Sequence, residues 1–502
     1  MQAHSSSAES PHRRLTANTS APPALSLFAS CPRGLEAVLA QELEQLGAYS
    51  PRVAGAGVAF SADAKLAMWV NLKSRIASRV LMQVGSGRYR DEDGLYRLAK
   101  QTPWENWFDE RMTVRVDVSA QRSPLRSLNF AALRVKDALC DRFREASGVR
   151  PSVDTREPDV RIFAFLSATE ATLYLDLSGE SLFKRGWRAA DSAKGTAPLK
   201  ENLAAGLLAL AGWEPTIPLH DPYCGSGTIL IEAAQQALNI APGINRRFAF
   251  ERLLGFDALL LADLRQAAHD QAATAIAHHR RSEAGLRLTG ADIDPQSIQR
   301  AKHNLARAGI PEGIIKLSVA DFGSPSSKAP PLRKPLVSHQ GKAGDGNTGA
   351  DIEQSASAGL RGLIVTNPPY GERMRAISEF ETGDEDSEST RPVRPRNERL
   401  SGRQYARGSG TELPAHSHAR IDGARRPSAQ GSDSLADAVH EKAMQAAGQT
   451  LRRAFGGWRA CLLSPDSELP RQLGMQPRRK TPLFNGAIEC RLYCFDIFAR
   501  PD

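Results

Sequence analysis

Residues 221–228 read DPYCGSGT, and this stretch follows a short apolar run and opens a helical pattern. Gly225 and Gly227 lack a Cβ, so the backbone can turn tightly and approach a ligand closely. The free N–H groups of the following helix then face whatever occupies the turn. Asp221 distinguishes this loop from a dinucleotide-binding loop, because a carboxylate repels a pyrophosphate and attracts an ammonium group. The third small residue of the dinucleotide fingerprint is also missing, since Leu230 stands at that position.

The region around this loop repeats strand and helix patterns from about residue 198 to the C-terminus. A strand over 217–220 precedes the loop and a helix over 228–238 follows it, an alternation typical of a mainly parallel sheet. The last two β-patterns, 480–484 and 488–498, are close together, so we expect the sheet to end in an antiparallel hairpin. Further strands are expected over 286–293, 314–319, 362–366 and 460–464, and a further helix over 295–308.

Acidic residues follow two later strands of this region. Asp292 ends the next strand, at the place where doubly wound folds hold ribose hydroxyls. Asp321 follows a further strand, where an adenine amine can donate to it. Asp294 precedes a proline and is interpreted as a helix N-cap. Together with Asp221, Asp292 and Asp321 place acids at successive strand ends, which indicates a nucleoside ligand that carries an ammonium group.

The motif NPPY at residues 367–370 indicates the reaction. Its two prolines stiffen the turn and remove backbone donors, which leaves the side-chain oxygen of Asn367 and the carbonyl of Pro368 as acceptors. An exocyclic amine on an aromatic ring is a poor nucleophile, because its lone pair is delocalised into the ring. Two acceptors that hold its N–H bonds can aim the lone pair at a methyl sulfonium, so positioning does most of the work. Tyr370 offers a face on which the base can stack.

Two further α+β patterns precede the loop region. The first has a strand and two helices, expected over 25–30, 34–46 and 62–80. The second has a strand, a helix and a β-hairpin, expected over 114–118, 130–146, 160–166 and 171–177. Basic residues are frequent in the second pattern and together predict a phosphate-binding face. They are Arg111, Arg115, Arg122, Arg126, Arg134, Lys136, Arg142, Arg144 and Arg150.

The composition limits the class of protein. With 502 residues, 41% of them hydrophobic, the chain has room for two to four folded domains. The net charge of +9 favours a polyanionic partner. The six cysteines lack paired spacing, which argues against a zinc ribbon or a disulfide framework and fits a reducing compartment. No apolar stretch approaches the roughly 18 residues of a membrane span. We therefore expect a cytoplasmic protein without a metal and without membrane contact.

Three segments are expected to lack a folded core. Residues 1–24 are rich in Ser and Ala and are interpreted as a disordered extension, with a weak organellar transit peptide as the alternative. Residues of about 323–358 and 382–433 are dense in Ser, Gly, Pro, Arg and Asp and are interpreted as disordered insertions. The arginines of the second insertion are interpreted as solvated rather than as RNA contacts.

On these motifs the chain resembles the THUMP-containing 23S ribosomal RNA guanine-N2 methyltransferases of the RlmL type. The resemblance covers nearly all of residues 25–498 except the two insertions. It includes the loop at 221–228 and the motif NPPYGER at 367–373. It also includes FASCPRGLE at 28–36, DLSG at 176–179, RGWR at 185–188 and APLKE at 197–201.

The resemblance implies an architecture of three domains after residues 1–24. These are a ferredoxin-like domain over 25–89, a THUMP domain over 90–180 that binds RNA, and a class I Rossmann-like methyltransferase domain over 181–502. It implies S-adenosylmethionine as the methyl donor, no metal, and 23S rRNA or a large-subunit assembly intermediate as the partner, with no obligate protein partner. The target guanine must leave its stack to reach the pocket. A fused second methyltransferase of this family lies beyond the last residue of this chain, so guanine-N7 activity is expected to be absent.

The candidate site residues divide into two groups. The expected donor-binding residues are Asp221, Tyr223, Gly225, Gly227, Asp292 and Asp321. The expected catalytic residues are Asn367, Pro368 and Tyr370.

The motifs leave other functions open. The NPPY element is shared with adenine-N6 and glutamine-N5 methyltransferases, so the same chemistry on tRNA, on DNA adenine or on a protein glutamine is an alternative. The basic α+β pattern argues against DNA and protein substrates. A non-catalytic RNA-binding or assembly factor that kept the fold is a second alternative, against which the intact Asp221, Asp292 and Asn367 argue.

Overall fold

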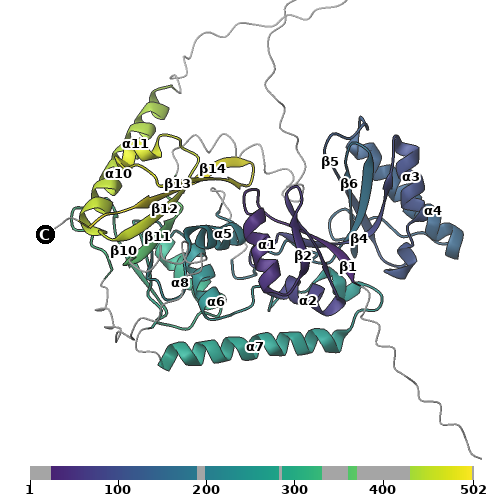
Figure 1. Cartoon of the computed structure of the whole chain (residues 1–502), viewed down its shortest axis with the longest axis horizontal. Coiled ribbons are helices and arrows are strands. Elements are labelled where there is room, and N and C mark those ends of the chain that lie inside the picture. The colour runs from purple at the N-terminus through teal and green to yellow at the C-terminus, as the bar shows by residue number, and fades with distance from the viewer. Residues whose placement is uncertain (1–23, 189–197, 282–284, 331–359, 370–429, 500–502) are drawn as a thin grey trace, which may run out of the picture.

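The computed structural model describes residues 24–188, 198–281, 285–330, 360–369 and 430–499, and the backbone alone within 430–439. These residues form two seven-stranded sheets, one in each of two units (Figure 1). We call residues 24–188 the first unit and the described residues from 198 onward the second unit. Residues 1–23 and most of both expected insertions lie outside the described residues.

The first unit is a seven-stranded sheet with four helices. Its strand order is β2-β3-β1-β4-β7-β6-β5. The strands are β1 (Leu25–Ser30), β2 (Tyr49–Val53), β3 (Gly57–Ala62), β4 (Arg79–Arg88), β5 (Val114–Ala120), β6 (Val160–Leu166) and β7 (Glu170–Asp176). The helices are α1 (Glu36–Gln45), α2 (Ala64–Lys73), α3 (Glu92–Gln101) and α4 (Leu128–Ser147). The expected hairpin is confirmed as the antiparallel pair β6 and β7.

Strand β4 joins the two α+β patterns into one sheet. Along one edge it pairs antiparallel with β1, where Met82 lies opposite Leu27, and along the other it pairs with β7 over the length of the strand. The strands of the two regions expected to be separate domains, 25–89 and 90–180, therefore belong to one continuous sheet. The helix expected over 62–80 is wrong beyond Lys73. The backbone of Ser74 is extended (φ −64°, ψ 130°), which ends α2, and Val80 is a buried strand residue of β4 although its spacing continues the helical pattern.

The second unit contains the mainly parallel sheet that the sequence predicts. Its strand order is β10-β9-β8-β11-β12-β14-β13, parallel from β10 to β12 and antiparallel in the last two strands. The strands are β8 (Leu219–Asp221), β9 (Leu288–Asp292), β10 (Ile315–Val319), β11 (Gly362–Thr366), β12 (Trp458–Ser464), β13 (Arg479–Asn485) and β14 (Ile488–Asp496). The helices are α5 (Glu201–Ala211), α6 (Thr228–Ala237), α7 (Ala258–Arg281), α8 (Pro295–Arg307), α10 (Gln430–Ala454) and α11 (Leu469–Leu473). Because α10 begins at Gln430, the second insertion ends before residue 433.

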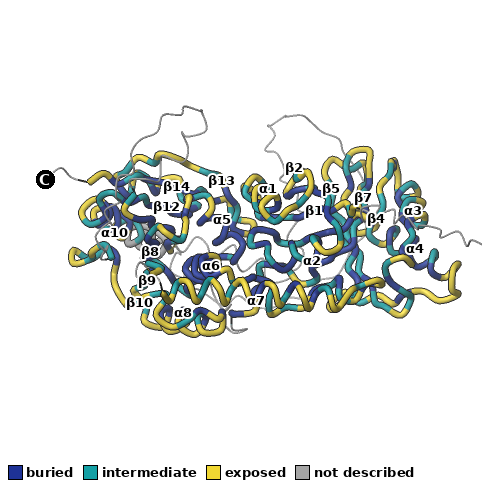
Figure 2. Tube along the Cα trace, turned by 60° about the horizontal axis from the view of Figure 1, so that its bottom comes forward, coloured by how far each residue is buried: buried dark blue, intermediate teal, exposed yellow. Residues whose placement is uncertain are grey.

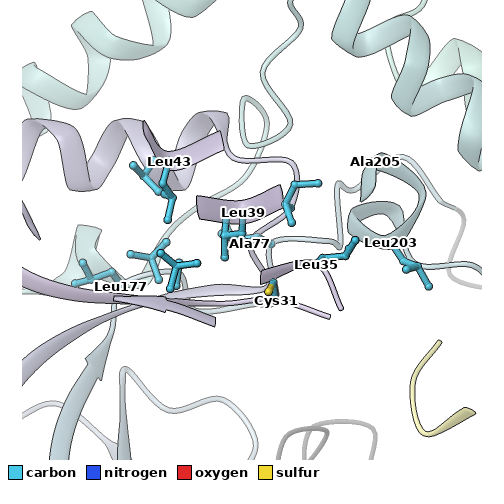
Figure 3. Close-up of a cluster of buried hydrophobic side chains, with 14 of the residues drawn as sticks. Cys31, Leu35, Leu39, Leu43, Ala77, Leu177, Leu203 and Ala205 are labelled. Carbon is cyan, nitrogen blue, oxygen red and sulfur yellow. The ribbon is translucent and has the colours of Figure 1, made fainter. Parts of the chain in front are cut away.

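A shared hydrophobic core connects the units. Buried side chains of the first sheet and of helices α5 and α6 form one contiguous cluster, and Figure 2 shows buried chain running from β1 and α2 to α5 and α6. Figure 3 shows Leu35, before α1, beside Leu203 of α5. A Cβ on Gly206 of α5 would approach Leu35 Cδ1 to 2.3 Å, so the two elements are in contact. Helix α7 extends along both units in Figure 1, and Gln271 in it accepts a hydrogen bond from Lys73 in α2 (3.0 Å).

Candidate active site

The parallel strands bring the predicted site residues to one edge of the second sheet. Strands β8, β9 and β11 end at Asp221, Asp292 and Thr366, and β8 lies between the other two. Thr366 Oγ1 donates a 2.6 Å hydrogen bond to Asp221 Oδ1. Asn367 directly follows Thr366, so the loop after β8 and the loop after β11 are side by side. The structure therefore places the glycine loop and the start of the NPPY motif at the same edge of the sheet, on neighbouring strands.

The glycine loop is anchored to the end of β9 by two hydrogen bonds. Gly225 N donates to Asp292 Oδ2 (2.9 Å), and Cys224 N donates to Ala291 O (2.9 Å). Gly225 and Gly227 have φ of +50° and +84°, a region that residues with a Cβ rarely adopt. At Gly227 a Cβ would also meet Ala301 Cβ at 3.2 Å. Glycine is thus required here both for the turn and for the close approach of α8.

Asp221 is buried under this loop, with 2% of its surface exposed. Its Oδ1 accepts hydrogen bonds from Thr366 Oγ1 and from Tyr223 N (3.3 Å). Burial raises the pKa of Asp221 to about 7, a rise that these hydrogen bonds oppose and that the nearby Asp292 adds to. A cationic group that binds beside Asp221 would favour its ionised form.

Asp292 has a structural role that the sequence interpretation did not include. Its Oδ2 accepts from Gly225 N and its Oδ1 accepts from Asp294 N (2.9 Å), so the carboxylate braces the glycine loop. The side chain is half-buried, and each carboxylate oxygen keeps a second lone pair for a hydroxyl donor. Asp294 is confirmed as the N-cap of α8, because it accepts from Gln296 N and Ser297 N.

Ile293 is a candidate site residue that sequence reasoning missed. It directly follows Asp292 and is 68% exposed, although its neighbour Ala291 is buried. An aliphatic side chain exposed at the carboxyl end of a sheet, beside Asp292, is suited to contact a flat apolar ring. Its position one residue after the acid at the end of β9 was the available signal.

Tyr223 contacts Phe322, the residue that directly follows Asp321. Tyr223 meets the ring of Phe322 edge-on with centroids 5.7 Å apart, and burial raises its pKa. Asp321 is exposed, and its Oδ1 accepts from Gly323 N (2.8 Å), which shapes the turn after β10. Phe322 in turn packs against the buried ring of Phe455, with the two rings tilted by 56° and their centroids 5.7 Å apart. Tyr223 is therefore held in place by the core of the second unit.

The NPPY motif follows a strand that is buried at every position. Asn367 is half-buried, Pro368 is buried and Pro369 is exposed. The motif thus begins at the floor of the site and turns toward solvent. Tyr370, the third expected catalytic residue, lies outside the described residues.

Arg188 connects three motifs at the start of α6. Its guanidinium donates to Glu201 Oε1 (2.6 Å), Leu199 O (2.6 Å) and Thr228 Oγ1 (2.8 Å). Thr228 is the first residue of α6 and follows Gly227. The RGWR and APLKE motifs, which are distant from the glycine loop in sequence, therefore hold the residue that ends the loop.

A buried ionic network, formed by Glu42, Arg75, Arg185 and Glu232, links α6 to the first unit. Arg185 Nε donates to Glu232 Oε1 (3.2 Å), and Arg75 Nη1 lies 3.6 Å from Glu232 Oε2. Arg185 Nη2 donates to Arg75 O (2.6 Å), and Glu42 Oε1 accepts from Arg75 N (2.7 Å). Arg75 Nη2 also donates to Gln235 O (2.9 Å) in α6. Two buried ion pairs, together with the backbone contacts of Glu42, thus join α6 to the first unit.

The described parts of the chain place no three His, Cys, Asp or Glu side chains where they could share a metal ion. Within the same ranges, no helix combines the length and apolar character needed to cross a membrane. All six cysteines are unpaired and buried. Cys490 and Cys494 belong to the hydrophobic core.

Three family models match successive parts of the chain. An RlmL ferredoxin-like domain matches residues 26–81, a THUMP domain matches 89–176, and an RMKL-like methyltransferase domain matches 185–327. The first two together cover the first unit, and the third covers the glycine loop and the strand ends at Asp292 and Asp321.

Proteins named ribosomal RNA large subunit methyltransferase K/L are similar to most of the chain. The one from Aeromonas salmonicida (strain A449) is 34% identical over 471 residues, which are 94% of this chain and 54% of that protein. The one from Methylococcus capsulatus (strain ATCC 33009 / NCIMB 11132 / Bath) is 35% identical over 481 residues, 94% of this chain and 51% of that protein. The chain thus spans about half the length of the curated relatives it matches.

Solved structures share the arrangement of both units. SMU.472, described as a methyltransferase and solved with S-adenosylhomocysteine, is 25% identical with a TM-score of 0.66, over 95% of this chain and 99% of that one. A predicted N6-adenine-specific DNA methylase from Listeria monocytogenes is 25% identical with a TM-score of 0.67, over 95% and 97% of the two chains. TrmN from Thermus thermophilus, 17% identical with a TM-score of 0.54 over 94% of this chain and all (100%) of that one, shares the fold.

Proposed function

We propose that the chain is a THUMP-containing, RlmL-like methyltransferase, and that it methylates the exocyclic N2 amine of a guanine in 23S rRNA with S-adenosylmethionine as donor; the three matching family models and the similar rRNA methyltransferases support this proposal. The observation that carries the proposal is the contact between the two predicted loops. Thr366, next to Asn367, donates to Asp221 at 2.6 Å, which supports the proposal that an acceptor held at the NPPY motif would lie beside a methyl donor held at the glycine loop.

The residues around the glycine loop fit the methyl donor. Its amino-acid ammonium would pair with Asp221, its ribose hydroxyls would donate to Asp292, and its adenine would lie against Ile293 with its amine toward Asp321. Gly225 and Gly227 leave room for the chain between these ends, and Tyr223 limits the site from the side of Phe322. When bound, the donor supplies an electrophilic methyl group on a positively charged sulfur.

The NPPY motif would hold the acceptor. The side-chain oxygen of Asn367 and the carbonyl of Pro368 accept the two N–H bonds of the guanine N2 amine and direct its lone pair at the methyl carbon. The nitrogen forms a bond to that carbon as the carbon–sulfur bond breaks, and the sulfur keeps the electron pair. The methylated nitrogen then loses its extra proton to solvent. Tyr370 would stack on the base.

The remaining assignments follow from the same family. We assign residues 25–89 to a ferredoxin-like domain, 90–180 to a THUMP domain and 181–502 to the methyltransferase domain, close to the three matched ranges. The substrate is 23S rRNA or a large-subunit precursor particle. Such an enzyme acts in the cytoplasm, where unpaired buried cysteines like those of this chain stay reduced.

A second candidate function is methylation of adenine N6 in DNA. The Listeria monocytogenes structure, similar over both units, is described as a predicted N6-adenine-specific DNA methylase, and an NPPY motif suits either amine. The match of a THUMP domain at residues 89–176 favours RNA.

The test is transfer of labelled methyl groups to protein-free 23S rRNA, to precursor particles and to DNA, followed by mass-spectrometric mapping of the modified nucleotide. We expect N2-methylguanine in the RNA. Asn367→Ala should abolish transfer while S-adenosylmethionine affinity, measured by calorimetry, stays close to wild type. Transfer to DNA instead of RNA would support the second candidate, and a fall in both quantities would show that Asn367 has another role.

A further inference from the structure

Most basic side chains of residues 90–180 are neutralised by acids. Six of the nine that were expected to form a phosphate-binding face make ion pairs within the first unit. The pairs are Arg111–Asp109, Arg115–Asp117, Arg134–Asp93, Lys136–Asp137, Arg142–Glu105 and Arg144–Asp141. The fold thus places acids beside most members of the expected phosphate-binding face, and that the nine act as one face stays a prediction.

Two arginines on the loop before α4 differ from these six. Arg122 and Arg126 are exposed, and within the described residues their side chains have no ion pair and no hydrogen bond. The loop itself is well anchored. Tyr89, which is 3% exposed, donates to Ser167 O (2.7 Å) and its hydroxyl also forms a hydrogen bond with Ser123 Oγ (2.8 Å), and Gln121 N donates to Leu166 O.

Exposed apolar side chains continue from these arginines onto α4. Phe130 is 48% exposed and Leu133 is 50% exposed, although α4 buries its other face against the first sheet. Phe130 and Leu133 are three residues apart in α4 and therefore lie on one face of the helix, and Arg126 lies on the loop two residues before the helix begins. The first turn of α4 contains no acid, and Asp93 on the neighbouring α3 is already paired with Arg134. Two arginines without an acidic partner among the described residues thus stand on the loop that leads directly into α4, whose first turns carry the exposed ring of Phe130.

We propose that Arg122, Arg126, Phe130 and Leu133, which we call the THUMP patch, bind an unpaired segment of the RNA substrate. The proposal rests on the proposed function only in taking RNA as the partner. The guanidinium groups contact phosphates, and Phe130 stacks on an unpaired base while Leu133 covers the edge of the ring. The patch selects single-stranded RNA, because the bases of an A-form duplex are stacked inside and offer no face to Phe130.

Three variants test the patch by their affinity for a fluorescent, unstructured oligoribonucleotide and for a hairpin of similar length whose strands are joined by a non-nucleotide linker, so that it has no unpaired base. Phe130→Ala should weaken binding to the single strand by about 5- to 150-fold, the usual loss of one base–aromatic stack. Arg126→Gln should flatten the salt dependence by about 0.7 in the slope of log K against log salt. Neither variant should change hairpin binding appreciably.

Arg122 provides a variant that separates binding from folding. Its backbone has φ +60°, which suits glycine better than arginine. Arg122→Gly should therefore keep or raise the melting temperature and still weaken binding to the single strand. Arg144→Gln is the matched control for loss of charge, because Arg144 lies on the same helix and is paired with Asp141. Leu259→Ala is the control for loss of an exposed apolar side chain, since Leu259 is 80% exposed on α7.

The outcomes separate this proposal from the proposed function. Wild-type affinity for the single strand in all three patch variants, or equal losses in the two controls, would overturn the patch even in an enzyme that methylates 23S rRNA. Loss of single-strand affinity confined to the patch variants would support the patch even if no methyl transfer to rRNA is detected. A wild-type chain that binds hairpin and single strand equally would also overturn it.

Discussion

Glu232 carries a large part of the contact between the two units, and Glu232→Gln removes its charge with little change in shape. The carboxylate is fully buried, and it faces Arg185, whose side chain is 1% exposed, and Arg75, whose side chain is 13% exposed. Without it, two buried guanidinium groups keep only their hydrogen bonds to backbone carbonyls. Removing one member of a buried ion pair typically costs about 3–5 kcal/mol, because a charge stays buried without its partner.

This cost should appear in the unfolding of the whole chain. At about 2–4 °C per kcal/mol for a unit of this size, the melting temperature should fall by roughly 6–20 °C. We expect urea titration to give the change in free energy, and calorimetry to show a transition that broadens or splits, because the network spans both units. Asp109→Asn is the control, since its partner Arg111 is 84% exposed and such pairs contribute about 0–1 kcal/mol.

The charge of Glu232 and its packing make separate contributions to stability, and variants can distinguish them. Glu232→Gln should lower the free energy of unfolding much more than Asp109→Asn does. Methionine at Arg75, Arg185 and Glu232 together should recover part of this loss, because apolar replacements leave no buried charge. A cost for Glu232→Gln equal to that of the control, with one unchanged transition, would show that the network does not stabilise the contact between the units.

Three further predictions concern the donor loop. Burial raises the pKa of Asp221 to about 7 in the folded chain, from about 4 in an unfolded one. Between these pH values the folded state binds more protons, so the free energy of unfolding should fall as pH rises, whereas S-adenosylmethionine affinity should rise through pH 7. Asp221→Asn should remove both trends in calorimetric titrations. Gly227→Ala should weaken donor binding at least about tenfold, because it adds a strained φ and a contact with α8, whereas Gly212→Ala, with φ +70° and open space, should leave affinity unchanged in the same assay. Arg188→Gln should raise the KM for S-adenosylmethionine and leave the KM for RNA unaltered, and equal changes in the two constants would contradict its positioning role at α6.

The sequence predicted the site better than it predicted the contacts between distant elements. Asp221, Asp292 and Asn367 each follow a buried run of apolar residues, and parallel strands must bring such positions to one edge. The order of β8 beside β11 could not be read from spacing, since it depends on how the sheet is assembled. The ionic network is invisible in sequence because its members come from α1, the turn before β4, the RGWR motif and α6.

The helical spacing of apolar residues gave a wrong prediction where it continues beyond the end of a helix into a strand. Ile76 and Val80 continue the helical period of α2, and only the pairing of β4 with β1 shows that the helix ends at Lys73. The excess of arginine after residue 90 indicated a polyanion. Which arginines remain available was decided by acids such as Asp93 and Glu105, which the fold carries to them.

Strand β4 makes the whole of the first sheet one continuous body, and the shared core fixes that body against the methyltransferase fold. The two units therefore keep a fixed separation and orientation. If the first unit binds an unpaired stretch of RNA, the second unit can reach only those guanines that lie at a fixed distance from that stretch. Target choice would then depend on the folded shape of the ribosomal RNA as much as on the bases next to the modified nucleotide.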